Sequence, residues 1–193
     1  MLLGVIFIVL LLTVPLARGR LSRLGDLQIR MPGLAVAGIL SHVLIVSVLP
    51  TGLAGLHQAV HLLSYALLGA CAWLNRRIPG VPLIAVGGLL NAIAIVANGG
   101  VMPLDPALVV HSSQEGGREF VNSGVVAHPR LLFLGDIFAT PRDWPLANVY
   151  SIGDFTILLG VAVLLHRVSG SRLLAWWPHR RRRRSPVPAE GRA

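Results

Sequence analysis

The sequence contains little charge, a single cysteine and no lysine. Only 13% of its 193 residues are charged, 54% are hydrophobic, and the mean hydropathy is +0.70. In a typical soluble domain about a quarter of the residues are charged. The composition therefore argues against that class and predicts a polytopic membrane protein in one compact unit. The single Cys71 excludes an internal disulfide framework. Because it lies within an apolar segment, we expect it to pack as a small side chain.

Motifs that identify several common functions are also absent. The sequence contains no internal repeat, no glycine-rich phosphate loop after a strand and no cysteine-based metal motif. Its net charge of +9 results from 17 arginines and 8 acidic residues. An excess of basic residues often indicates nucleic-acid binding. Here the arginines cluster between apolar segments, so membrane topology explains them better. We expect no nucleic-acid partner.

Five apolar segments stand out, at about residues 2–17, 33–49, 53–74, 81–97 and 149–165. Each is near the ~20 residues that cross a bilayer, although several are at the short end. They predict an all-α integral membrane protein with about five transmembrane helices, in which residues 1–172 form a single domain. The first segment is followed by arginines and has no basic region before it, so we interpret it as an uncleaved helix and not a signal peptide.

The distribution of arginine predicts the orientation of these segments. Most of the 17 arginines lie within residues 18–30, at Arg76 and Arg77, or after residue 166, whereas residues 98–148 hold Arg118, Arg130 and Arg142. The positive-inside rule therefore places the N-terminus outside and the C-terminus inside, as an odd number of spans requires. The predicted location is the cytoplasmic (inner) membrane, with the loop 98–148 on the extracytoplasmic side.

The second half of this loop, residues 125–140, is apolar again but short. An interfacial or re-entrant helix fits its length better than a sixth span. A sixth span would also place the arginine-rich C-terminal tail outside, against the charge rule.

The tail, residues 173–193, carries Trp176 and Trp177 beside a run of five arginines. Tryptophan next to a basic run is typical of an interfacial anchor, so the expected partners are the lipid bilayer and its anionic inner-leaflet lipids. The proline-rich end of this cytoplasmic tail is predicted to be disordered. The arginines of the run are Arg180, Arg181, Arg182, Arg183 and Arg184.

Several polar residues fall at membrane depth in the outer part of the predicted bundle. Such residues are costly and usually have a partner, so they define a candidate polar pocket that opens outward. A histidine on a helix can instead form a hydrogen bond to a neighbouring helix and so stabilise helix packing. His57 and His61 have metal-ligand spacing, but two ligands do not make a site, and we expect no metal and no cofactor. The candidate pocket residues are His42, His57, His61, Asn91, Asn98 and Asn148.

Two aspartates, Asp136 and Asp154, carry the remaining chemistry. Ser151 and Asp154 have the spacing of a capping box, and a carboxylate in the first turn suits the helix dipole, so Asp154 can simply start the last helix. Asp136 can likewise cap or solvate a loop helix. Alternatively, two nearby carboxylates share a proton, so that one activates water while the other protonates the scissile group.

The segments 98–103 (Asn-Gly-Gly-Val-Met-Pro), 134–137 (Leu-Gly-Asp-Ile) and 148–154 (Asn-Val-Tyr-Ser-Ile-Gly-Asp) resemble a bacterial domain-of-unknown-function family. The likeness spans most of the chain. It implies a small five-pass membrane protein, and it implies no activity.

A shorter stretch resembles prolipoprotein signal peptidase, an intramembrane aspartyl protease. Asp136-Ile137-Phe138 is similar to that family's first catalytic segment, and Asn148 to Asp154 to the motif that opens its last helix. This resemblance implies Asp136 and Asp154 as a catalytic pair. The sequence departs from the family in the longer spacing between Asn148 and Asp154 and in lacking the motif before the first aspartate.

Three hypotheses follow from these patterns. The preferred one is a structural or partner-binding membrane protein, because capping explains Asp154. The second is an outward-facing aspartyl hydrolase that uses Asp136 and Asp154. The third is a metal or haem site built on His42, His57 and His61. Whether the protein is an enzyme stays open at this point.

Overall fold

The computed structural model describes residues 2–47, 54–111, 123–141, 144 and 148–174. Five α-helices dominate this part of the chain, which confirms the expected number. They are α1 (Leu2–Leu16), α2 (Pro32–Ser47), α3 (Ala54–Leu74), α4 (Val81–Ala97) and α5 (Ile152–Val168). Among the described residues, no helix is both long enough and apolar enough to cross a membrane.

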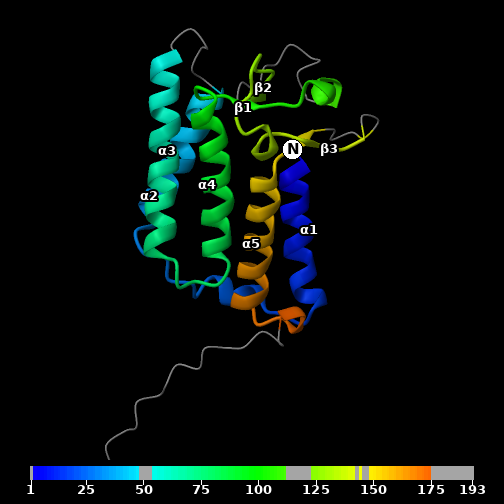
Figure 1. Ribbon diagram of the computed structural model, residues 1–193. Helices are drawn as coiled ribbons and strands as arrows, with labels where there is room; N and C mark the ends of the chain where they lie inside the picture. Colours follow the sequence, from blue (N-terminus) through cyan, green and yellow to red (C-terminus); the bar gives the residue numbers. More distant parts are fainter. Residues whose placement is uncertain (1, 48–53, 112–122, 142–143, 145–147, 175–193) are drawn as a thin grey trace, which may run out of the picture.

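The helices form one bundle in which each contacts its neighbour. Helix α2 packs on α3, α3 on α4, α4 on α5, and α5 on α1. Figure 1 shows α1 on the side of α5 away from α4. The chain begins at one end of the bundle and reaches residue 174 at the other, as expected for an odd number of helices (Figure 1).

Helices α4 and α5 approach most closely at glycines. A Cβ added at Gly87 would lie 2.5 Å from the carbonyl oxygen of Gly153, and one added at Gly160 would lie 2.7 Å from the backbone nitrogen of Ile84. Small residues at a helix interface allow the two backbones to come this close. The close approach brings the middle of α4 against the first turn of α5.

A layer of short strands and turns, here called the outer layer because it lies outside the helical bundle, covers one end of the bundle between α4 and α5 (Figure 1). Its side chains join the bundle through a core of Ala94, Ile95 and Met102, against which Tyr65 and Leu134 pack. Two strand pairs define the layer, β1 (Met102–Pro103) parallel to β2 (Ser123–Gly124), and β3 (Phe138–Ala139) antiparallel to β4 (Val149–Tyr150). It also contains the 3-10 turns η2 (Pro106–His111) and η4 (Leu132–Leu134).

The outer layer corrects the expectation of an interfacial or re-entrant helix over residues 125–140. Only the three residues of η4 are helical there, and Leu131 before them has a left-handed backbone with φ of 53°. Gly135 then leaves η4 in extended conformation, and β3 pairs with β4. The backbone of residues 136–140 therefore pairs with other segments of the outer layer, and the fold is mostly helical instead of all-α.

The start of α5 also differs from the expected segment 149–165. Val149 and Tyr150 form strand β4, and Ser151 caps the helix, so α5 begins at Ile152 and continues to Val168. Apolar, β-branched and aromatic residues suit a strand as well as a helix, which is why hydropathy alone placed the start too early.

At the opposite end, the turns η1 (Leu21–Leu24) and η5 (Arg172–Leu174) join the ends of α1 and α5. The backbone nitrogen of Arg20 donates to the carbonyl of Ser169 at 2.9 Å, and that of Arg172 donates to the carbonyl of Ala17 at 2.9 Å. Two backbone hydrogen bonds thus hold these connecting segments together.

Candidate functional site

The first polar cluster joins the start of α5 to the middle of α4. Ser151 caps α5: its hydroxyl accepts from the Asp154 backbone nitrogen at 3.1 Å, and the Asp154 carboxylate accepts from the Ser151 nitrogen at 3.0 Å. The predicted capping box is confirmed. The structure adds Asn91, whose amide donates to the Asp154 carboxylate at 2.9 Å and accepts from the Ser151 hydroxyl at 2.9 Å.

These three residues form a closed hydrogen-bond network, in which each residue is bonded to the other two. Ser151 and Asn91 are buried, so their hydrogen-bonding groups depend on one another and not on water. Gly153 is required here, because a Cβ at that position would collide with the amide oxygen of Asn91. The network therefore depends on the close α4–α5 approach described above.

The second cluster is centred on Asp136 in the outer layer. Its backbone nitrogen donates to the carbonyl of Pro103 at 2.9 Å, and its carbonyl accepts from the nitrogen of Asp105 at 3.1 Å. Its carboxylate accepts from the Ser123 hydroxyl at 2.6 Å. Asp136 thus connects three separate segments of the outer layer, and only 5% of it is exposed.

Electrostatics set Asp136 apart from an ordinary surface carboxylate. The pKa of Asp136 is raised to about 6: burial raises it most, the hydrogen bond from Ser123 partly offsets this, and the negative charge of Asp154 adds a smaller upward effect. The two aspartates therefore interact through charge. Their hydrogen bonds, however, go to different partners: Asp136 is held by Ser123, and Asp154 by Ser151 and Asn91.

The predicted histidines are only partly described. His61 on α3 is 1% exposed, and its ring centroid lies 5.3 Å from that of Tyr65 one turn away. The side chains of His42 and His57 lie outside the described residues. Within the described ranges, no three side chains of histidine, cysteine, aspartate or glutamate are grouped as metal ligands would be.

Asn98 acts on the backbone at the end of α4. Its amide nitrogen donates to the carbonyl of Arg130 at 2.7 Å, and its amide oxygen accepts from the Arg130 nitrogen at 2.8 Å. The same amide nitrogen donates to the carbonyl of Ala94 at 2.7 Å. Asn98 thus ties the loop to the helix end, and Asn148 contributes through its backbone, which pairs with Thr140.

Asn75 was missed by the sequence analysis. Like that of Asn98, its side-chain amide bonds the backbone of a loop and of a helix end, here at the other end of the bundle. Its amide oxygen accepts from the Arg30 nitrogen at 2.8 Å, and its amide nitrogen donates to the carbonyls of Arg30 at 2.9 Å and Cys71 at 2.8 Å. The available signal was its position, since Asn75 directly follows an apolar helix just as Asn98 does.

His166 near the end of α5 was also missed. It is buried, its Nδ1 lies 2.7 Å from the Ser171 hydroxyl, and its Nε2 lies 3.1 Å from the Thr13 hydroxyl of α1. This ring therefore links α1 to α5. No spacing motif accompanies it, because its partners come from the first helix and the following turn.

The structure thus gathers Asn91, Asp136 and Asp154 at the end of the bundle that carries the outer layer. Asn98 lies at this same end, where it fixes the loop. The five arginines of the tail lie outside the described residues. The arrangement can stabilise the junction between bundle and outer layer, and it places one protonatable buried carboxyl there.

Comparison with known proteins places the chain in a family. The model of a family of unknown function, DUF5317, matches residues 26–166, and the chain belongs to that family. This confirms the expected membership of a family of unknown function. An uncharacterized protein of Thermotoga maritima is 29% identical over 102 residues, which cover 52% of this chain and 59% of the relative. No solved structure matches the chain.

Proposed function

We propose that this DUF5317 protein is a multi-pass protein of the cytoplasmic membrane with a structural or partner-binding role. The observation that carries the location is the distribution of side chains. Large apolar residues are exposed along the helices, including Ile8, Leu40 and Leu89, while buried positions hold His61, Asn91 and other polar residues. Apolar exteriors with hydrogen-bonded polar interiors suit a bundle surrounded by lipid.

Charge supports the proposed orientation. Within the described residues, the end of the bundle away from the outer layer holds Arg76, Arg77 and Arg172 among others, whereas Asp105, Asp136 and Asp154 lie at the outer-layer end. We therefore place the outer layer on the extracytoplasmic side and the arginines at the cytoplasmic face. The tail arginines would extend this contact with anionic lipid.

The described helices are shorter or less apolar than an ordinary membrane span, so the proposed location requires a thin or locally thinned bilayer. Helices α1 to α5 have 15, 16, 21, 17 and 17 residues, so at 1.5 Å per residue they are about 22 to 32 Å long. Helices shorter than the hydrocarbon core are accommodated by bilayer thinning and by flanking arginines whose stems reach the interface.

The hydrogen bonds of the two aspartates support a structural role for both. Asp154 starts α5 and holds Asn91, and Asp136 fastens three segments of the outer layer. The outer layer exposes the aromatic side chains of Phe133 and Trp144, and exposed aromatics are typical anchors of a protein interface. We propose that these two side chains contact a protein partner.

A photo-crosslinking amino acid at Phe133 or Trp144 tests the partner-binding role. Each should give a discrete crosslinked product in intact cells, whereas the same probe at Leu89, an exposed position on α4, should not. If the outer positions crosslink no more than Leu89 does, the partner-binding role is wrong, and the membrane location has to be judged separately by membrane fractionation.

The aspartyl hydrolase remains a second candidate, favoured by one observation. Asp136 is a buried carboxyl whose pKa is raised to about 6, mainly by burial and to a smaller extent by the charge of Asp154, so it can hold a proton close to neutral pH. Asp136→Asn and Asp154→Asn, scored for both protein abundance and phenotype, separate the roles. A loss of phenotype at unchanged abundance in both variants favours catalysis, whereas parallel loss of abundance and phenotype favours structure.

A further inference from the structure

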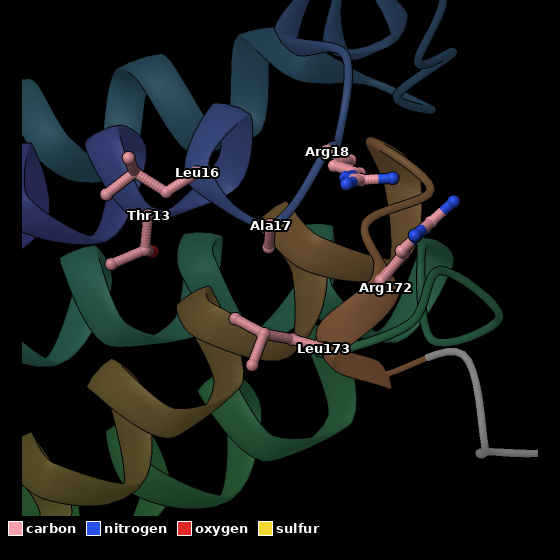
Figure 2. Close-up of a pocket in the computed structure, with 6 residues that line it drawn as sticks. All are labelled: Thr13, Leu16, Ala17, Arg18, Arg172 and Leu173. Carbon is pink, nitrogen blue, oxygen red and sulfur yellow. The ribbon is translucent and has the colours of Figure 1, made fainter.

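The end of α1, the two residues that follow it and the turn η5 form an open groove of about 480 Å³ at the arginine-rich end of the bundle. Figure 2 shows the side chains of Arg18 and Arg172 close together at one side of it, with the apolar residues extending along the helices. Leu16 and Leu173 are exposed, by 82% and 56%. The lining residues are Thr13, Leu16, Ala17, Arg18, Arg172 and Leu173.

The backbone fixes the two arginines next to each other. The Arg172 nitrogen donates to the carbonyl of Ala17 at 2.9 Å, directly beside Arg18. Arg18 has a left-handed backbone with φ of 60°, and its nitrogen donates to the carbonyl of Pro15 at 2.9 Å. This turn ends the helical path of α1 and directs the chain across the end of α5.

Both guanidinium groups are exposed and, within the part of the chain that the structure describes, neither makes a hydrogen bond or an ion pair. Acidic residues are scarce at this end, since Asp26 is the only one among residues 1–104. Two neighbouring guanidinium groups without carboxylate partners supply the positive charge and the hydrogen-bond donors that a phosphate group binds.

We propose that this groove binds an anionic glycerophospholipid of the cytoplasmic leaflet. The phosphate lies between Arg18 and Arg172, and the start of an acyl chain follows Leu16 and Leu173 along the bundle. The apolar lining favours a lipid over a soluble phosphate. An acyl chain would cover the exposed leucines and remove apolar surface from water, whereas an inorganic anion would not. This inference rests on the proposed membrane location, and it uses Arg18 and Arg172, not the tail arginines.

Lipid retention by the purified full-length protein in detergent micelles tests the site. Phosphatidylglycerol and phosphatidylcholine are added, and bound lipid is counted by native mass spectrometry. The unmodified protein should retain phosphatidylglycerol selectively. The double variant Arg18→Gln/Arg172→Gln should bind it about tenfold to thirtyfold more weakly, since each arginine at a lipid surface contributes about 1 kcal/mol.

A matched control removes two arginines at the same end of the bundle that do not line the groove, Arg76→Gln/Arg77→Gln. It should retain nearly full affinity. Equal weakening in both double variants would indicate diffuse charge attraction and overturn the site. Competition by inorganic phosphate at concentrations that leave lipid micelles unchanged would identify an anion site and overturn the lipid assignment.

Fractionation of cell membranes keeps this test distinct from that of the proposed function. A protein absent from the membrane fraction refutes the proposed location. A membrane-bound protein without selective loss in the groove variant refutes only the lipid site.

Discussion

At the residue scale, Asn91 is a buried side chain that bonds two residues of the neighbouring helix start. Its amide is buried and holds both Ser151 and Asp154, so each group depends on the others for its hydrogen bonds. Asn91→Ala leaves the Ser151 hydroxyl and one carboxylate oxygen without these partners. We expect it to lower the free energy of unfolding by about 1–3 kcal/mol, measured by thermal unfolding in detergent.

Thr156→Ala is a suitable control for this prediction. Its hydroxyl bonds only the carbonyl of Ile152 in its own helix, at 2.8 Å. Its removal should change stability by less than about 0.5 kcal/mol. Equal effects of the two variants would show that the α4–α5 network contributes nothing beyond an ordinary side-chain hydrogen bond.

Asp136 makes stability depend on pH. Its pKa is raised from 3.8 to about 6, so the folded state holds this proton more tightly than the unfolded chain does. The contribution of protonated Asp136 is complete below pH about 4 and is lost as pH rises to about 6, at a cost of up to about 3 kcal/mol. Asp136→Asn should remove this fall in the unfolding free energy between pH 4.5 and 7. Asp26→Asn, a change at an exposed acid, should leave it in place.

At the element scale, adjacent glycines on α4 should respond in opposite ways. A Cβ at Gly87 would press on the backbone of α5, whereas one at Gly88 would meet nothing within 4 Å. Gly88→Ala should stabilise the helix by about 0.5–1 kcal/mol, because alanine loses less backbone entropy. Gly87→Ala should instead separate α4 from α5 and lower the melting temperature. A stabilising Gly87→Ala would contradict the close packing.

The same elements show which parts of the fold were predictable. The limits of α4 follow from an apolar run that ends at Asn98 and Gly99, and the capping box at Ser151 follows from spacing alone. Strand β4 before α5 and the segment 125–140 were not, because their backbone hydrogen bonds go to partners that are distant in the sequence. Local patterns specify an element only where no distant segment competes for its backbone.

The candidate site divides in the same way. Asp154 and Ser151 are three residues apart, so their relation can be read from the sequence. Asn91 lies 63 residues from Asp154, and Asp136 lies 13 residues from Ser123 across the loop. His166 contacts the hydroxyl of Thr13, which lies 153 residues away in the sequence. Polarity identified Asn91 and Asp136 as candidates, but only the packing of α4, α5 and the outer layer assigns their partners.

At the scale of the whole molecule, the proposed orientation predicts which face is accessible from outside the cell. Single cysteines are introduced as Trp144→Cys in the outer layer or Arg77→Cys at the opposite end, with the buried native thiol removed by Cys71→Ala. A membrane-impermeant maleimide should label the Trp144→Cys protein in intact cells. It should label the Arg77→Cys protein only after permeabilisation, because arginine-rich loops face the cytoplasm. The reverse pattern would invert the topology, and it would then place the Arg18–Arg172 groove in the outer leaflet.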